Sequence, residues 1–479
     1  MALTVVNYTN KILEKGGIIV YDLSSKMQYF YNEYVVLPGD IQADLFKKKR
    51  LNISRLKEGL EIYNLENGRD YKVLSVITQG SIAMHTAIQN DKKDYDIDVA
   101  VIFDKDNIKD IGPQAIKNVV EFALKKTCSN FSTAPEAKTN CVRIEYAEGY
   151  HIDFAIYRRI KQQDGTYTYE HAGSRWRLRD PNAINNWFRN EVSEKGTELR
   201  QVVRLLKTFS KSRDDWKMPG GLIQSVLCDE VDFAHIEKLD EIFLYCLEKI
   251  KGRLNESTDV MNPVDESISL LMKKADTTKM ENLSSRLTQH LKKMDALYDK
   301  DCDEATAYAV WREFFQHDFW NLEAENLREN SNSQVNFSKD MYTSYNLNEE
   351  YIEDIVPVEE QFDVTISCTA TRDGFRGHPL TYFLNKFHLV PQKLHLTFSA
   401  KCDIPGNYDV WWKVKNVGQE AKRRNYIRGE IIRGNGKKSR IHKESSVFYG
   451  PHYIECYVIK NGVCIAIDHL DVPIDKNAF

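Results

Sequence analysis

The stretch YDIDVAVIF at residues 95–103 joins two acidic residues to a long apolar run. Successive side chains of a β-strand point to opposite faces of the sheet, so Asp96 and Asp98 would lie side by side on one face. The other face would carry only apolar and aromatic residues: Tyr95, Ile97, Val99, Val101 and Phe103. This alternation predicts a strand that packs one face into a core and presents two carboxylates on the other.

A third acidic residue occupies a similar position in a second apolar run. Asp153 lies in HIDFAIY, residues 151–157, on the face opposite Ile152, Phe154 and Ile156. Adjacent carboxylates repel unless a cation lies between them, and hard divalent cations combine such oxygen ligands with substrate phosphates. Three converging carboxylates would hold two metal ions about 3.5–4 Å apart, which activate an attacking hydroxyl and stabilise departing pyrophosphate. We therefore expect Asp96, Asp98 and Asp153 to be catalytic, metal-binding residues. Together they would hold two Mg²⁺ (or Mn²⁺) ions.

A pair of small residues, Gly80-Ser81, follows the apolar stretch Val73 to Ile77 and precedes an expected helix that begins near Ile82. Backbone N–H groups at the start of a helix attract anions, and glycine lets a phosphate approach the backbone closely. By itself, a Gly-Ser pair before a helix is most often an ordinary helix cap. Because the acidic pair follows nearby, we interpret Gly80 and Ser81 as part of a triphosphate site.

Two amphipathic helices are expected, one over residues 40–63 and one over residues 199–211. The second carries basic residues along one face, at steps of four, three and four: Arg200, Arg204, Lys207 and Lys211. Like charges at these spacings destabilise a helix by roughly a few tenths of a kcal/mol per pair. A bound triphosphate would compensate for this repulsion, and the alternative is a solvated face that salt screens.

The spacing of hydrophobic residues changes along the rest of the chain and separates it into regions. Residues 232–320 keep a helical period, with Ile268, Leu271 and Met272 included, and residues 325–360 are polar and acidic like an exposed linker. From residue 361 the period is two, and Lys460-Asn461-Gly462 between two strand-like runs predicts a hairpin. The predicted fold class is α+β. A mixed sheet with helices and a helical lobe would occupy residues 1–325, a linker residues 326–360, and a small all-β domain, expected to be a sandwich, residues 361–479.

A basic stretch interrupts the strands of this β domain, with nine lysines and arginines from Lys422 to Lys443. Trp411 projects opposite Trp412, so one of the two rings would be exposed for stacking. A solvated basic loop on an ordinary sandwich and a ligand site fit this pattern about equally well. A nucleotide or nucleic-acid ligand at the C-terminal domain is therefore a hypothesis.

Composition argues against several classes of protein. The 479 residues carry a formal net charge of −4, so the overall charge does not indicate a nucleic-acid-binding protein. Nine cysteines without a C-x-x-C pair favour free thiols in a reducing compartment over a zinc site or a disulfide framework. No apolar stretch approaches the roughly 20 residues that span a bilayer, and the N-terminus lacks the pattern of a signal peptide. We expect a cytoplasmic protein without a membrane partner.

Together these motifs resemble the bacterial cGAS/DncV-like nucleotidyltransferases, or CD-NTases of the SMODS type, over roughly residues 35–320. The resemblance rests on six short motifs: QGS at 79–81, DYDIDV at 94–99, YHID at 150–153, DP at 180–181, LLK at 205–207 and PGG at 219–221. The C-terminal part is similar to the AGS-C sensor domain that is appended to some of these enzymes, through YDVWWKV at 408–414 and GPHYIE at 450–455.

The resemblance implies a polymerase-β-like nucleotidyltransferase core that makes a cyclic di- or trinucleotide second messenger from NTPs, ATP and/or GTP. It further implies a role in anti-phage defence of the CBASS type, with a separate downstream effector. It assigns nucleotide binding to five residues: Gln79, Gly80, Ser81, Arg143 and Lys207. Relatives often have Pro-Ser-Gly where this chain has Pro219-Gly220-Gly221, so a serine contact is missing or supplied elsewhere.

Two other functions stay open. A template-independent nucleotidyltransferase acting on RNA ends or oligonucleotides would extend a primer, and a catalytically silent nucleotide or nucleic-acid sensor would turn nothing over. The three carboxylates disfavour the silent sensor. The sequence does not choose the bases, the 2′ or 3′ linkage, the ring size, the activating signal or the oligomeric state.

Overall fold

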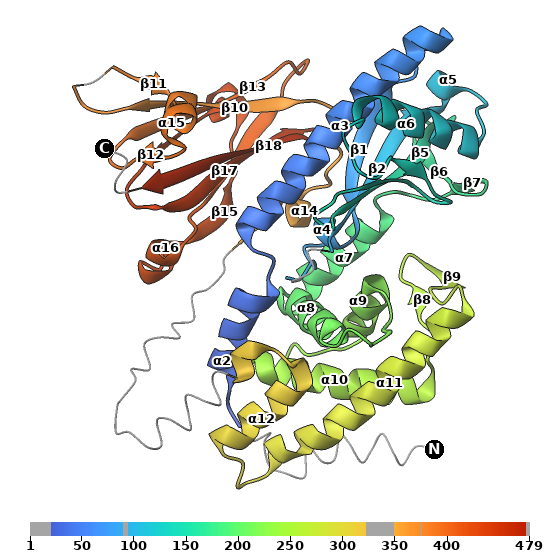
Figure 1. Cartoon of the computed structure of the whole chain (residues 1–479), viewed down its shortest axis with the longest axis vertical. Helices are drawn as coiled ribbons and strands as arrows, with labels where there is room; N and C mark the ends of the chain where they lie inside the picture. Colours follow the sequence, from blue (N-terminus) through green and yellow to red (C-terminus); the bar gives the residue numbers. More distant parts are fainter. Residues whose placement is uncertain (1–20, 90–93, 322–348, 375, 476–479) are drawn as a thin grey trace. The chain divides into compact units, whose positions relative to one another are not determined.

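The computed structural model describes residues 21–89, 94–321, 349–374 and 376–475 (Figure 1). The chain divides into two units. The helical unit comprises Met1–Leu37, His85–Gln89 and Asn190–Ser344, and the sheet unit comprises Pro38–Met84, Asn90–Arg189 and Tyr345–Phe479. Most of the predicted linker, residues 326–348, lies outside the described residues.

A mixed seven-stranded sheet forms the first part of the sheet unit, in the order β1-β2-β5-β4-β3, with β6 beside β5 and β7 beside β6. Its strands are β1 (Val73–Gln79), β2 (Asp96–Asp104), β3 (Glu136–Ala137), β4 (Val142–Glu145), β5 (His151–Lys161), β6 (Tyr167–Ala172) and β7 (Trp176–Leu178). The predicted strand is β2, and its apolar residues from Ile97 to Phe103 are buried on both faces. Strand β2 pairs antiparallel with β1 and parallel with β5, which places it in the middle of the sheet.

Helices of this unit include α3 (Gly39–Asn67), α4 (Gly80–Ala83), α5 (Lys105–Ile108) and α6 (Pro113–Thr127). The predicted helix at residues 40–63 is confirmed by α3, which packs against α6. The contact is so close that a Cβ atom on Gly59 would lie 2.0 Å from the carbonyl oxygen of Ala123. The expected helix near Ile82 is only the single turn α4, because the chain passes into the helical unit at His85.

In the helical unit the helices are α2 (Ser24–Phe30), α8 (Glu198–Lys211), α9 (Gly221–Asp229), α10 (Leu239–Glu256), α11 (Lys274–Met294) and α12 (Glu304–Phe315). A π-helical turn η1 (Tyr31–Val35) and a 3₁₀ turn η2 (Asp295–Tyr298) extend α2 and α11, and α7 (Ala183–Lys195) contains the boundary between the units. Aromatic rings fill the core, with Phe209 of α8 stacked on Phe314 of α12 at 4.1 Å.

One part of the predicted helical region is wrong. Residues 261–269 form a small hairpin, β8 (Met261–Asn262) and β9 (Asp265–Ser269). Ile268 and Met272 do not belong to a core stripe, since 43% and 76% of their surfaces are exposed. Four short polar side chains in this segment accept hydrogen bonds from the local backbone and favour turns over helix: Asp259, Asn262, Asp265 and Ser269.

The C-terminal part of the sheet unit is a β sandwich, as predicted. One sheet has the order β11-β10-β13-β16, from β10 (Val364–Thr371), β11 (His378–Pro379), β13 (His395–Cys402) and β16 (Ile441–Ser445). The other has the order β12-β18-β17-β14-β15, from β12 (Val390–Pro391), β14 (Asp409–Lys415), β15 (Arg428–Ile432), β17 (Gly450–Lys460) and β18 (Val463–Asp475). Short helices and a 3₁₀ turn connect them: α14 (Ile352–Ile355), α15 (Leu380–Phe387), α16 (Gln419–Arg423) and η4 (Gly436–Arg440).

Residues 357–362, the connecting segment, bond to the mixed sheet and to the sandwich sheet that contains β18. Glu360 exchanges two backbone hydrogen bonds of 2.9 Å with Val76 of β1. Just before it, the N–H of Glu359 donates to the carbonyl of Cys464 in β18, and the N–H of Cys464 donates to the carbonyl of Pro357, each at 2.9 Å. A stretch that has the composition of a linker thus joins the mixed sheet to the sandwich.

Candidate active site

Two neighbouring strands bring the predicted catalytic carboxylates together. Asp98 of β2 is the register partner of Asp153 of β5, and because these strands are parallel the two side chains share a face. Asp96 lies two residues before Asp98 and therefore on the same face. Burial raises the pKa of Asp98 to about 6, with the charges of Asp153 and Asp96 adding to the effect. Burial also raises the pKa of Asp96, although Arg143 opposes the shift.

Arg143 of β4 forms a two-pronged ion pair with Asp153. Its Nε lies 2.8 Å from Oδ1 and its Nη2 lies 2.7 Å from Oδ2. The β4–β5 register fixes this pair, since Arg143 stands opposite Asp153. The guanidinium supplies the positive charge nearest the three carboxylates, and Asp153 raises the pKa of Arg143.

The donor chemistry suits a divalent cation. Burial, and after it the charges of Asp153 and Asp96, raise the pKa of Asp98, and a cation would relieve the repulsion among these carboxylates, which are the oxygen ligands Mg²⁺ prefers. Within the described ranges, however, no three His, Cys, Asp or Glu side chains are arranged to hold a metal ion. Arg143 already bonds both oxygens of Asp153, so a metal ion at this residue would share these oxygens with the guanidinium or displace it.

Gly80 lies directly against the carboxylate of Asp98. A Cβ atom on this residue would stand 2.3 Å from Asp98 Oδ2, and the residue has a φ of +66°, a conformation that favours glycine. Gln79, the register partner of Asp98, donates from Nε2 to the carbonyl of Pro181 at 2.5 Å, and Ser81 is half-buried on the same turn. The structure therefore gathers Gln79, Gly80 and Ser81 beside the carboxylates. With a single helical turn following, the helix N-terminus expected here as an anion site is absent.

Lys207 belongs to the helical unit, whereas the other predicted site residues belong to the sheet unit. Its Nζ donates to the carbonyl and to Oγ1 of Thr86, at 3.0 and 2.8 Å. Burial lowers the pKa of Lys207 to about 7, and Arg204 and Lys211 add to the shift. Arg200, Arg204 and Lys207 are 3%, 6% and 8% exposed, so this part of the helix face is not the solvated face that was the alternative prediction, whereas Lys211 at its end is exposed.

The Pro219-Gly220-Gly221 turn is packed against Lys207 at its second glycine. A Cβ atom on Gly221 would lie 3.0 Å from Cε and 3.2 Å from Nζ of Lys207. A Cβ atom on Gly220 would meet nothing within 4 Å. The position at which relatives often have serine therefore has room for one.

Two residues near the carboxylates were not predicted. Nδ1 of His151 lies 3.3 Å from Oδ1 of Asp96, and the charge of Arg179 lowers the pKa of Asp98 against the effect of burial. His151 precedes Asp153 by two residues, so the strand alternation that identified Asp153 also places His151 on its face. No local pattern marks Arg179.

Comparison with known families identifies both parts of the chain. The model of the cyclic GMP-AMP synthase DncV-like nucleotidyltransferase domain matches residues 75–157, which contain most of β1, all of β2, β3 and β4, and the first seven residues of β5. The chain carries a DncV-like nucleotidyltransferase domain. The model of the adenylyl/guanylyl and SMODS C-terminal sensor domain matches residues 346–475, the β sandwich with the connecting segment. The predicted membership in the bacterial CD-NTases with a C-terminal sensor domain is thereby confirmed.

Individual relatives agree with this assignment. A cyclic GMP-AMP synthase of Escherichia albertii is 24% identical over 409 residues, which cover 82% of this chain and 83% of the relative. The crystal structure of the DncV cyclic AMP-GMP synthase of Vibrio cholerae matches with a TM-score of 0.50 and 17% identity, over 60% of this chain and 95% of that one. Its complex with nonhydrolyzable GTP matches with a TM-score of 0.51, over 62% and 97%. These structures share the fold of the DncV-like domain.

The predicted fold class, α+β with a nucleotidyltransferase core and a C-terminal β domain, is confirmed by these matches. Among the described residues, no helix combines the length and apolar character that crossing a membrane requires. The roles of individual site residues stay predictions.

Proposed function

We propose that this CD-NTase joins NTPs into a cyclic di- or trinucleotide and releases pyrophosphate. The observation that carries the proposal is the convergence of Asp96, Asp98 and Asp153 on neighbouring strands beside Gly80. The relatives support it, because the Escherichia albertii protein is a cyclic GMP-AMP synthase and the Vibrio cholerae enzyme was solved with the linear intermediate pppA(3′,5′)pG. ATP and GTP are therefore the first substrates to test.

In this proposal each residue has a distinct task. Asp96, Asp98 and Asp153 hold two Mg²⁺ or Mn²⁺ ions, which when bound activate a sugar hydroxyl and offset the charge of pyrophosphate. Arg143, which bonds both oxygens of Asp153, would contact the nucleotide. The Gln79-Gly80-Ser81 turn contacts the triphosphate through its backbone and the Ser81 hydroxyl.

Lys207 binds phosphate in this proposal, and its surroundings support the assignment. A buried amine with a pKa near 7 takes up a proton when an anion arrives, because the anion stabilises the charged form. Phosphate binding would then pair the newly protonated amine with an anion. The product would act on a separate downstream effector in a CBASS-type defence system, in the cytoplasm.

The decisive experiment incubates the full chain with all four labelled NTPs and Mg²⁺ or Mn²⁺, and then treats the products with phosphatase. We expect small phosphatase-resistant products. Asp96→Asn combined with Asp98→Asn should abolish pyrophosphate release while the far-ultraviolet circular dichroism spectrum is unchanged. Asp94→Asn, a substitution in the same acidic motif outside the strand pair, is the matched control and should retain most of the activity.

Other outcomes contradict the proposal in identifiable ways. A ladder whose length grows with time and depends on a primer indicates a template-independent polymerase. No turnover of any NTP with either metal indicates a nucleotide or nucleic-acid sensor. Activity that survives the double asparagine substitution contradicts the catalytic assignment itself.

A further inference from the structure

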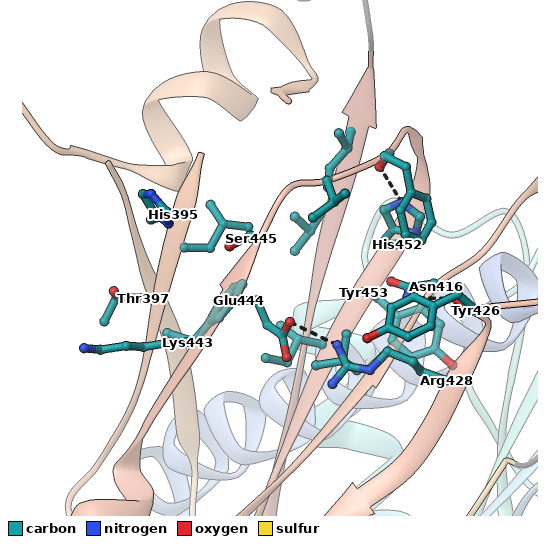
Figure 2. A pocket seen from close by; sticks show the side chains of 18 of the residues that line it. His395, Thr397, Asn416, Tyr426, Arg428, Lys443, Glu444, Ser445, His452 and Tyr453 are labelled. Atoms are coloured by element: carbon teal, nitrogen blue, oxygen red, sulfur yellow. Dashed lines mark hydrogen bonds and ion pairs between the residues drawn. The ribbon is translucent and has the colours of Figure 1, made fainter. Parts of the chain in front are cut away.

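A pocket of about 1020 Å³ opens in the C-terminal sensor domain, well away in sequence from the predicted catalytic residues (Figure 2). It lies along β16, which among the described strands pairs with β13 alone, and opposite β14, β15 and β17 of the other sheet. Its volume is at the upper end of the range of small-molecule sites. Residues of both sheets therefore line one cavity large enough for a nucleotide.

Two arginines form the basic part of the polar lining. Arg424 and Arg428 line the pocket with Glu444, and each arginine is bonded to one glutamate, Arg424 to Glu420 and Arg428 to Glu444. Arg428 Nη1 lies 3.0 Å from Glu444 Oε2, a pair that spans the gap between β15 and β16 (Figure 2). Lys443 points to the other side of the β16 edge, toward Thr397. An anion is the ligand that the two guanidinium groups favour.

Arg428 is held in its position at a conformational cost. Its φ is +60°, in the left-handed region that side chains other than glycine rarely adopt, and the φ of Gly429 is +126°. Such strain persists where the surrounding structure enforces it, and it is concentrated at binding sites. Here it accompanies a guanidinium that faces the pocket.

One end of the pocket is aromatic. The Tyr426 and Phe448 rings lie 6.2 Å apart edge to face, and the guanidinium of Arg424 lies 5.3 Å from the centre of the Phe448 ring. Tyr426 is 52% exposed, so its ring is accessible for stacking. His452 packs on Phe448 and is held neutral, since Nδ1 accepts from the N–H of Val417, Nε2 donates to the carbonyl of Phe448, and burial lowers its pKa.

We propose that this pocket binds a nucleotide. The base stacks on the aromatic end, formed by Tyr426 and Phe448, while the phosphates meet Arg424 and Arg428. Base–aromatic stacking tolerates any base, and arginines bind phosphate through two parallel hydrogen bonds. Asn416, which is buried in the lining, provides an amide beside the aromatic end. This site is separate from the proposed active site and does not depend on its activity.

Two neighbouring arginines provide a matched test. Arg423 and Arg424 both bond Glu420, but only Arg424 lines the pocket. Binding of ATP, GTP, CTP and UTP is measured one at a time by titration calorimetry on the full chain carrying Asp96→Asn and Asp98→Asn, which prevents turnover. At least one nucleotide should show a binding event that Arg424→Gln weakens by about tenfold or more, whereas Arg423→Gln changes it by less than about twofold.

A second variant tests the aromatic end. Tyr426→Ala should weaken the same event for the nucleotide and leave the binding of inorganic tripolyphosphate unchanged, because tripolyphosphate has no base to stack. Thermal unfolding of each variant checks that the sandwich still folds.

Three outcomes overturn the proposal. The first is that Arg424→Gln weakens the binding of none of the four nucleotides. The others are that tripolyphosphate binds as tightly as every nucleotide, or that only single-stranded RNA binds. Failure of the proposed catalysis is a different result, because nucleotide binding that depends on Arg424 would still be measured.

Discussion

At the scale of single residues, Gly80 packs directly against the carboxylate of Asp98. We expect Gly80→Ala to lower the rate of nucleotidyl transfer by about 100-fold or more, because the new Cβ must displace the Asp98 carboxylate it would otherwise approach to 2.3 Å. The strained φ should also cost about 1–3 kcal/mol of stability. Initial rates of pyrophosphate release and chemical denaturation measure the two effects.

Gly68 is the matched control, since its φ is +59° and a Cβ there would meet nothing within 4 Å. Gly68→Ala should share the conformational strain but keep the activity. If both variants lose activity equally, strain alone is the cause and the contact with Asp98 is irrelevant.

The two glycines of the 219–221 turn give a second residue-scale prediction. Gly220→Ser should be tolerated, with stability unchanged or higher by roughly a few tenths of a kcal/mol, because Gly220 is the N-cap of α9 and has free space. Gly221→Ser should lower kcat/KM for NTPs by about tenfold, because its Cβ would press on the Lys207 amine. Steady-state kinetics measures kcat/KM for both variants. Equal values of kcat/KM would contradict the assignment of Lys207 to phosphate binding.

At the scale of elements, the hairpin of β17 and β18 carries a buried histidine with a pH-dependent contribution to stability. His469 Nε2 lies 2.9 Å from Asp471 Oδ1 and its Nδ1 lies 3.3 Å from Glu455 Oε1. Burial lowers the pKa of His469, but the bonds to Asp471 and Glu455 outweigh it and raise the pKa to about 9. The unfolded value is about 6.5, so the charged form is stabilised by folding.

The bonds of charged His469 to Asp471 and Glu455 should therefore stabilise the fold fully below about pH 6.5. This stabilisation should disappear as the pH rises through about 9. Its size is about 3 kcal/mol at most. Denaturation curves from pH 6 to 9 should show a steeper loss of stability in the natural chain than in His469→Gln. His378→Gln, at an exposed histidine, should leave the slope unchanged, and parallel slopes for all three proteins would contradict the assignment.

Elements with a strong local pattern were predictable from the sequence. The alternation of residues 95–103 indicated β2, and the hairpin followed from Asn461 and Gly462, whose φ values of +52° and +76° suit such a turn. The β8–β9 hairpin was not predicted, because apolar residues at helical spacing outweighed the turn-forming residues around them.

Contacts between distant segments were not predictable in the same way. The carboxylates could be grouped because alternation alone places Asp96, Asp98 and Asp153 on strand faces. The fork between Arg143 and Asp153 depends on the β4–β5 register, which no local pattern determines. The burial of the basic face of α8 likewise depends on partners remote in sequence, such as Thr86 and Tyr31.

At the scale of the whole molecule, the connecting segment is anchored by a buried ion pair. Lys49 Nζ lies 2.7 Å from Glu360 Oε1 and 3.1 Å from Thr78 Oγ1. Glu360→Ala should lower the free energy of unfolding by about 3–5 kcal/mol, because it leaves the buried Lys49 charge without its carboxylate. Lys49→Met combined with Glu360→Leu should recover most of that loss.

The exposed pair of Lys57 and Asp363, 3.5 Å apart, is the control. Asp363→Ala should change stability by less than about 1 kcal/mol, since solvent screens exposed pairs. Denaturant unfolding of the four proteins makes this comparison. A loss for Glu360→Ala no larger than that for Asp363→Ala would show that the segment is not anchored by this pair.

The bonds of the connecting segment also have a thermodynamic consequence. Val76 shares its strand with Gln79, which leads to Gly80, while Cys464 shares its strand with Val472 and Ile474, which line the sensor-domain pocket. If a ligand in that pocket alters how tightly NTPs are held, NTPs must alter the affinity of that ligand by an equal factor. The affinity of such a sensor domain for its ligand would then depend on the NTP concentration, just as the affinity for NTPs would depend on the concentration of the ligand.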